Sequence, residues 1–201
     1  MTPAADTEEP VDVFVAGTLF LDIVFTGMAA PPMTGHELWT EGMGSSPGGV
    51  ANLAVACSRL GMSTALAAAF GGDAYGDFCW KVLDDGEGID LSPSQRYEGW
   101  HSPVTVSMCY DDDRAMVTHG HPPPTSADAM IGTPPAARVC FIELGGDTSE
   151  RHGLVQPAWV TAAAAVGSMV FTDVGWDSSE EWDAIALRRG LEGCHAFGTN
   201  A

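Results

Sequence analysis

The stretch from residue 45 to residue 61 restricts how this chain can fold more than any other part of its sequence. It begins with Pro47, Gly48 and Gly49, which predict a tight turn, and continues at once into an apolar stripe of helical period. Glycine accepts positive φ and leaves space for a ligand, and the first turn of a helix has backbone N–H groups without intrahelical partners. The stretch therefore indicates a turn into a helix, which serves either as a plain structural junction or as a cradle for a polar molecule.

The helix after this turn should cover residues 50–60, with Gly61 as its C-cap. Asn52 would lie in the first turn, where its amide can donate a hydrogen bond to one hydroxyl and accept one from another. A site built from the glycine turn and Asn52 would therefore suit a polyhydroxylated molecule. The apolar face of the helix carries Val50, Leu53, Ala54, Cys57 and Leu60.

Apolar strands alternate with helices along most of the chain. Strands joined by helices of this length pair in parallel, so we expect a three-layer α/β/α sandwich around a mostly parallel sheet. The strands expected are 11–16, 63–70, 139–144, 169–174 and 194–197. The other helices expected are 75–83, 157–166 with proline in its first turn, and one that opens with a Ser178–Glu181 capping box and ends near 189.

Two segments depart from this alternation. Residues 102–110 and 115–119 predict a β-hairpin with Asp111, Asp112 and Asp113 as its turn. Residues 37–43 are polar and should be extended, ahead of the glycine turn. We therefore expect additional β structure beside the main sheet.

Charge and hydropathy argue against several classes of partner. The 201 residues include 27 acidic and 8 basic side chains, for a net charge of −19, which disfavours nucleic acid and anionic membranes. No apolar stretch reaches the roughly 18 residues that span a bilayer. Residues 1–10 are acidic and lack an apolar core, so we expect a short disordered tail rather than a secretory signal.

The cysteines are widely spaced, and none forms a Cys-x-x-Cys pair. His119 and His121 have no third ligand at fitting spacing, so neither a zinc site nor any other metal site is expected. Buried free thiols in a reducing compartment fit the pattern, and we expect a cytoplasmic protein. The five positions are Cys57, Cys79, Cys109, Cys140 and Cys194.

Asp22 follows shortly after the first expected strand. Ligands of open α/β sheets bind at the carboxyl ends of the strands, and a carboxylate can accept hydrogen bonds from two neighbouring hydroxyls. Asp22 is therefore a candidate sugar ligand, and the alternatives are an ordinary loop aspartate or a helix cap. Asp173 ends a later strand and could face the phosphate end of a pocket, whereas Asp73 in its glycine-flanked turn should bond its own backbone.

Taken in order, these landmarks resemble the ribokinase-like (PfkB) carbohydrate kinases over nearly the whole chain. Gly48-Gly49, Asn52 and the closing 59–61 resemble the family's N-terminal signature. The other matching landmarks are Asp22, the Gly-x-Asp-x-x-Gly turn at 72–76, the helix exit at 88–90, Asp173, and Thr199-Asn200.

The resemblance implies a ribokinase-like domain over residues 11–201 with a small β lid, formed by segments at about 35–47 and 98–120. In the family this lid covers the sugar and often pairs between subunits, so a homodimer through the lid is expected. The resemblance further implies that Asp22, Gly48, Gly49 and Asn52 contact the sugar. It implies ATP and Mg²⁺ as cofactors of the full-length family member, with Asn200 in the phosphate and magnesium region.

The family's catalytic segment is not found in these residues. The resemblance calls for a C-terminal Gly-Ala-Gly-Asp, whose amides form an anion hole and whose aspartate is the base. Residues 145–148 are only superficially similar and follow the wrong strand. We therefore expect the substrate-binding half of the fold, with the C-terminal part, the base and the ATP site beyond Ala201. Such a chain should be inactive and, alone, marginally stable, oligomeric or insoluble.

Two functions follow from these expectations. The first is a carbohydrate kinase that phosphorylates a sugar or sugar acid with ATP, represented here by its sugar-binding half. The alternative is a non-catalytic sugar-binding or regulatory homologue. A dinucleotide-binding domain is disfavoured because no Gly-x-Gly-x-x-Gly follows the first strand.

Overall fold

The computed structural model describes residues 9–145, 156–176 and 183–198. Several expectations lie outside these ranges and are not addressed by it: the tail at 1–8, the capping box of Ser178 and Glu181, and Asn200. None of the described helices combines the length and the apolar character needed to cross a bilayer.

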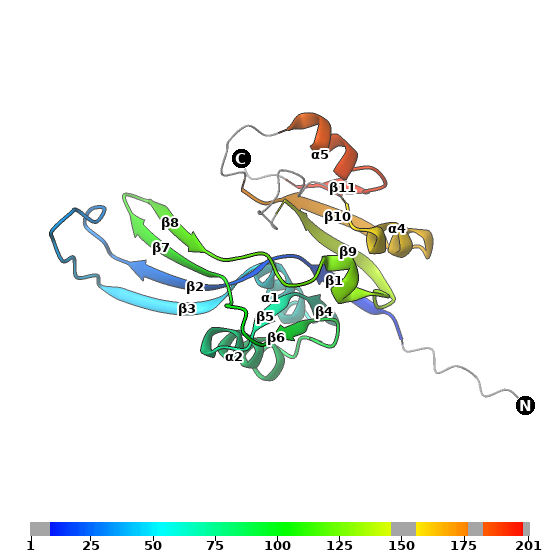
Figure 1. The fold of residues 1–201 in the computed structure, drawn as a ribbon, viewed down its shortest axis with the longest axis horizontal. Coiled ribbons are helices and arrows are strands. Elements are labelled where there is room, and N and C mark those ends of the chain that lie inside the picture. Colours follow the sequence, from blue (N-terminus) through cyan, green and yellow to red (C-terminus); the bar gives the residue numbers. More distant parts are fainter. Residues whose placement is uncertain (1–8, 146–155, 177–182, 199–201) are drawn as a thin grey trace, which may run out of the picture.

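A parallel sheet forms the centre of the molecule, as the alternation of strands and helices predicts (Figure 1). Every pairing within it is parallel. The strand order is β11-β10-β9-β1-β4. The strands are β1 (Val11–Ala16), β4 (Thr64–Ala67), β9 (Ala137–Leu144), β10 (Met169–Val174) and β11 (Ala196–Phe197).

Both faces of this sheet are covered, because successive residues of β1 enter different cores. Val13 and Val15 pack with α1 and α2 in one buried cluster, whereas Phe14 and Ala16 pack with α3 and α4 in another. Since neighbouring residues of a strand point to opposite faces, the two clusters lie on opposite sides of the sheet. The expected three-layer α/β/α sandwich is confirmed. Its helices are α1 (Ala51–Arg59), α2 (Ala74–Lys81), α3 (Ala127–Ile131), α4 (Ala158–Ala165) and α5 (Ala184–Gly190).

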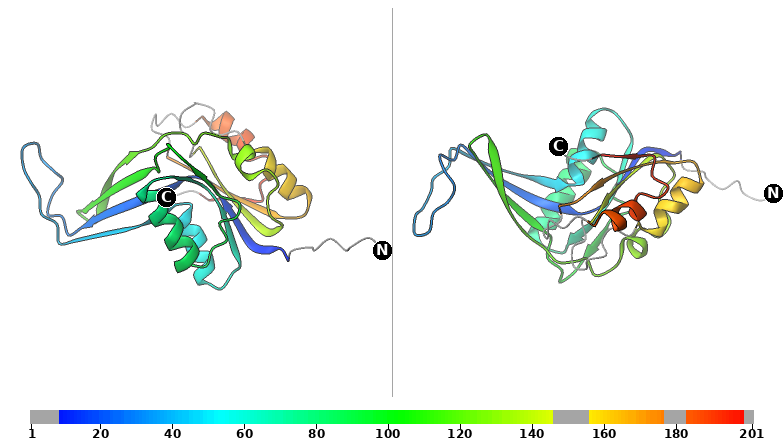
Figure 2. Two further views of the ribbon diagram at one scale, coloured as in Figure 1. Left: turned by 60° about the horizontal axis from the view of Figure 1, so that its bottom comes forward. Right: turned by 90° about the horizontal axis from the view of Figure 1, so that it is seen from above.

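A second, four-stranded sheet extends away from the layered body, as all three views show (Figures 1 and 2). Its order is β3-β2-β7-β8, in which only the β2–β7 pair is parallel. Its strands are β2 (Leu19–Thr26), β3 (Gly42–Gly49), β7 (Val104–Tyr110) and β8 (Asp113–His119).

The hairpin prediction is correct apart from the extent of its turn. Asp111 and Asp112 have φ of 51° and 63°, and they alone connect β7 to β8. Two central residues with positive φ match the right-handed twist of a hairpin. Asp113, expected in the turn, instead pairs with Tyr110 as the first residue of β8.

The structure differs from the sequence-based expectations at two residues of the second sheet. Asp22 follows β1 closely, as expected, but it lies in the middle of β2, a strand that was not expected, and is therefore neither a loop aspartate nor a helix cap. Gly48 does not lie in the turn expected at residues 47–49, because β3 runs from residue 42 through Gly49. Pro47 is tolerated there because β3 is an edge strand, where a missing N–H breaks no interior ladder.

The expected strand at 63–70 is divided in two. The N–H of Ala68 donates to the Ser94 hydroxyl at 3.0 Å, so the chain leaves the main sheet at this residue. It continues as β5 (Ala69–Gly71), which pairs in parallel with β6 (Gln95–Tyr97). After α2 the helix expected to end at 83 widens into one π-helical turn, η1 (Val82–Gly86).

Carboxylates accept hydrogen bonds from the N-terminal ends of two helices, α4 and α5. Pro157 precedes α4 as its N-cap rather than lying in its first turn, and Asp128 accepts hydrogen bonds from the N–H groups of Ala158 and Trp159. Asp183 caps α5 by accepting from Ile185 and Ala186. The expected last strand at 194–197 is shortened to the two residues of β11.

All five cysteines are free thiols. Cys57, Cys79 and Cys140 are buried as expected, whereas Cys109 and Cys194 are only partly buried.

Asp73 joins α2 to the start of the hairpin. Its carboxylate accepts hydrogen bonds from the Gly76 N–H at 2.8 Å and from the N–H and hydroxyl of Ser102 at 2.8 and 2.9 Å. Burial acts to raise the pKa of Asp73, but these hydrogen bonds hold it below its usual value. The charged carboxylate therefore stabilises the fold above the pKa of the unfolded chain, about 4, and this contribution is lost as the pH falls through the lowered pKa.

We expect Asp73→Asn to lower the free energy of unfolding by about 1–2 kcal/mol at pH 7, because a charged N-cap acceptor is lost. The difference from the parent chain should shrink below about pH 4, where the parent carboxyl also takes up a proton. Urea unfolding at both pH values measures this. Asp84→Asn, at an exposed site, is the control. An equal loss at both pH values would contradict the assigned cause.

Candidate functional site

Asp22 lies against the glycine pair. In β2 it is opposite Ser46 of β3 and Thr105 of β7. A Cβ placed on Gly48 would collide with both oxygens of the Asp22 carboxylate. Only glycine therefore leaves room at residue 48 for this carboxylate to lie across β3. The structure brings together these two residues, each of which is a candidate sugar contact by its place in the sequence.

Gly49 forms the turn from β3 into α1. Its φ is +62°, and a Cβ there would collide with the Thr18 carbonyl and lie 2.9 Å from the Phe20 ring. The N–H of Val50 donates to the same Thr18 carbonyl at 3.1 Å, and α1 begins at the next residue. The predicted turn thus exists but is compressed into a single residue.

Asn52 lies in the first turn of α1, as expected, and its side chain is exposed. Within the described part of the chain it contacts neither Asp22 nor the glycines through any hydrogen bond. It follows the glycine pair on the same helix start, so it borders the site while its amide remains available to solvent.

Burial raises the pKa of the Asp22 carboxyl above its ordinary value, and the positive charge of Arg114 on β8 acts against this rise. Burial and the charges of Asp22 and Asp73 raise the pKa of Cys79 to about 12. Cys79 is therefore a neutral thiol at physiological pH and is not a candidate nucleophile.

Glu143 is a further candidate for the site, and it was not singled out from the sequence. It lies near the carboxyl end of β9, and its Oε2 accepts a hydrogen bond from the Thr18 N–H at 3.3 Å. A Cβ on Gly17 would lie 3.1 Å from Glu143 Cβ and 2.5 Å from Val50 Cγ1. Gly17 is therefore packed closely against both Glu143 and the residue that precedes α1. The available signal was a carboxylate next to the last residue of a buried strand, where open α/β sheets bind ligands.

Asp173 is the register partner of Glu143 on the adjacent strand β10. Its Oδ1 accepts a hydrogen bond from the Val174 N–H at 2.7 Å. Burial raises the pKa of Glu143, the Thr18 N–H opposes this, and the negative charge of Asp173 adds to it. Two carboxyl groups are thus placed side by side where the parallel strands end.

These contacts form one continuous strip from Glu143 through Thr18 and Phe20 to Gly49, Gly48 and Asp22. Its two ends are carboxylates, which accept hydrogen bonds, and its middle is glycine backbone and one aromatic ring. Groups of this kind suit a molecule with several hydroxyls along its edge.

Other side chains singled out from the sequence do not join this strip. The rings of His119 and His121 lie with centroids 4.9 Å apart, and both side chains are exposed. In the parts of the chain that the structure describes, no group of three His, Cys, Asp or Glu side chains could hold a metal ion.

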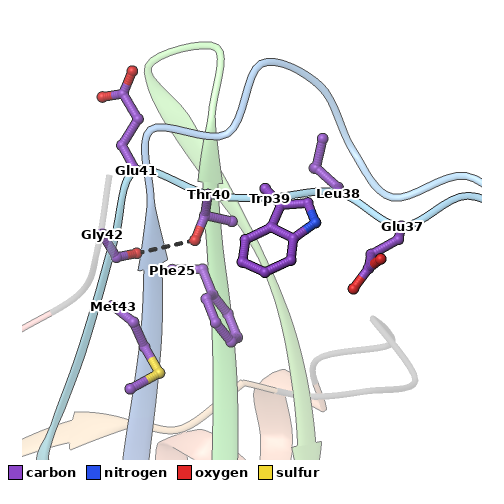
Figure 3. Close-up of a pocket in the computed structure, with 8 residues that line it drawn as sticks. All are labelled: Phe25, Glu37, Leu38, Trp39, Thr40, Glu41, Gly42 and Met43. Atoms are coloured by element: carbon purple, nitrogen blue, oxygen red, sulfur yellow. Dashed lines mark hydrogen bonds between the residues drawn. The ribbon is translucent and has the colours of Figure 1, made fainter.

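A hollow of about 410 Å³ lies at the far end of β2 and β3, away from the strip (Figure 3). The Trp39 and Phe25 rings lie near one another on one side of the chain, and Glu41 points away from them. Trp39 is 85% exposed. The hollow is lined by Phe25, Glu37, Leu38, Trp39, Thr40, Glu41, Gly42 and Met43.

Comparison with known proteins agrees with this architecture. Residues 37–123 match the pfkB family of carbohydrate kinases, a region that contains Gly48, Gly49 and Asn52. No curated protein matches the chain.

Solved structures resemble the chain at low sequence identity, and this likeness shows the fold. Ribokinase of Arabidopsis thaliana, solved with ribose and ATP, is 20% identical with a TM-score of 0.70 over 96% of this chain and 61% of its own. A nucleoside kinase of Methanocaldococcus jannaschii is 16% identical with a TM-score of 0.67, over 96% and 62%. Fructokinase of Xylella fastidiosa is 17% identical with a TM-score of 0.66, over 92% and 61%.

The chain therefore spans about 61% of the length of the ribokinase and fructokinase structures that it resembles. Three observations fit the same fold: the order of landmarks from Asp22 to Asp173, the two-sheet architecture, and the family match over residues 37–123. The chain has the ribokinase-like fold, and its residues 37–123 match the pfkB family of carbohydrate kinases.

Proposed function

We propose that this chain carries the sugar-binding part of a kinase that phosphorylates a sugar or sugar acid with ATP. The observation that carries the proposal is the Asp22 carboxylate, held against Gly48 beside the turn into α1. A half-buried carboxylate without a direct ion-pair partner among the described residues is poorly solvated. Hydroxyls of a bound sugar would supply the hydrogen bonds that it lacks.

The proposal assigns a role to each side of the strip. Asp22 accepts hydrogen bonds from two neighbouring hydroxyls, and Gly48 and Gly49 let the sugar approach the backbone. Asn52 donates and accepts from the start of α1. Glu143 accepts from a hydroxyl at the opposite end, where the Thr18 N–H orients its carboxylate.

Phosphoryl transfer also needs a base for the attacking hydroxyl, a phosphate cradle and a metal ion. Among the described residues, no group of three His, Cys, Asp or Glu side chains could hold a metal ion. Asn200, proposed for the phosphate region, lies outside the described residues. The cofactor assignment therefore rests on the family.

We also propose that the β3-β2-β7-β8 sheet is a lid over the sugar and a contact between two copies of the chain. The register places an apolar row on the face opposite Asp22. Met43 and Val117 in this row are 67% and 60% exposed, which is high for side chains of their size. The row comprises Phe25, Met43, Val106, Met108 and Val117.

Sugar binding should depend on the Asp22 charge. We expect Asp22→Asn to abolish the sugar-induced rise in melting temperature across a panel of sugars and sugar acids. The free energy of unfolding without sugar should not fall. Burial of the charged Asp22 carboxylate costs solvation, as its raised pKa indicates, and a neutral asparagine avoids this cost. Asp84→Asn is the control. Sugar-induced shifts that survive in Asp22→Asn would disprove the proposed site.

The glycine contact allows a matched comparison within one strand. We expect Gly48→Ala to lose sugar binding and about 1–3 kcal/mol of stability, because its methyl group would overlap the Asp22 carboxylate. Gly44→Ala, where a Cβ meets no atom within 4 Å, should change neither by more than a few tenths of a kcal/mol. Calorimetric titration with sugar and urea unfolding measure the two effects. Equal behaviour of the two variants would show that the close approach is irrelevant.

If two copies pair through the apolar row, Val117→Lys should shift the chain from dimer to monomer in analytical ultracentrifugation. A lysine there would place an unpaired charge in the contact. Val166→Lys, at a residue that is 79% exposed beside α4, is the matched control and should leave the mass unchanged. A parent chain that is monomeric at all concentrations would refute the contact.

A further inference from the structure

We propose that Phe20 determines which sugars the site accepts, by offering its ring as a flat apolar surface to the C–H face of a cyclic sugar. This inference rests on the proposed function, because it names the substrate class of the same site. It distinguishes between the two classes left open above, since a cyclic sugar has such a face and an open-chain sugar acid does not.

The Phe20 ring lies within the strip. In β2, Phe20 and Asp22 are two residues apart and therefore point to the same face of the sheet. Their partners on β3 are Gly48 and Ser46. The Phe20 ring atoms Cδ2 and Cε2 lie 2.9 and 3.2 Å from a Cβ placed on Gly49, so the ring covers the turn into α1.

The hydrophobic core does not use this ring. Leu19 and Leu21, its neighbours in β2, are 2% and 5% exposed and belong to the cluster beneath α1 and α2. Phe20 is only partly buried and packs in neither cluster. A large aromatic side chain that leaves part of its surface in water, next to a proposed ligand site, gains most by being covered when the ligand binds.

Polar groups flank the ring on both sides along the chain. Asp22 follows it by two residues, and the Thr18 N–H, which holds Glu143, precedes it by two. A ligand that covers the ring would meet an acceptor at each end. This arrangement matches a sugar ring whose hydroxyls project from its edge while its C–H groups form one apolar face.

The experiment measures dissociation constants by calorimetry for the parent chain and for Phe20→Leu, Phe20→Tyr and Asp22→Asn. The ligands are D-glucose, D-fructose and D-ribose as cyclic sugars, D-gluconate as an open-chain acid, and adenosine. Urea unfolding of each variant confirms that it is folded. Phe20→Tyr keeps the flat ring, so it separates the proposed contact from a loss of packing.

We expect Phe20→Leu to weaken the best cyclic sugar about tenfold, or about 1.4 kcal/mol, and Phe20→Tyr to restore it to within about twofold. The dissociation constant for gluconate should be unchanged by either substitution. Two results overturn the role of Phe20: Phe20→Leu weakens all ligands equally, or it weakens none of them. If binding is still abolished in Asp22→Asn, the proposed function stands in both cases. The role of Phe20 is also overturned if the parent chain prefers adenosine and Phe20→Leu loses this preference, since the ring would then stack on a base. Binding that survives in Asp22→Asn overturns the proposed function itself.

Discussion

Gly48 and Gly49 lack side chains, and this allows β3 to lie against the Asp22 carboxylate and to turn into α1 within one residue. The helix start, the second sheet and the carboxyl edge of the main sheet meet at this point. A side chain at residue 48 would occupy the space of the carboxylate, and one at residue 49 would require a strained backbone. The geometry of the candidate site therefore depends on a steric condition rather than on a strong bond.

The same strip concentrates partly buried negative charge. Asp22 and Glu143 both have pKa values raised chiefly by burial, in a chain whose net charge is already −19. Carboxylates in this position do not help the fold, because they lose solvation without forming an ion pair with any of the described residues. Groups that oppose stability and gather in one place are typical of sites shaped for a ligand.

Local patterns explain why part of the fold was predictable. β1, β10 and α1 were placed almost correctly, because each shows its own period and its own ending, such as Gly61 after α1. β2 was missed because Asp22 interrupts an apolar run. β3 was misread because its proline and glycines are typical of turns. As an edge strand beside a carboxylate, β3 needs those residues for reasons that only its neighbours supply.

From the residues alone, the sequence determined the parallel α/β class, the helix after the glycine pair, and Asp22, Gly48, Gly49 and Asn52 as the residues to examine. Only the tertiary structure decided that Asp22 lies on Gly48, that Phe20 stays outside both cores, and that Glu143 reaches Thr18 across 125 positions of sequence. The physical reason is range. Helix caps and strand periods arise between residues a few positions apart, whereas a site forms where the carboxyl ends of distant strands meet.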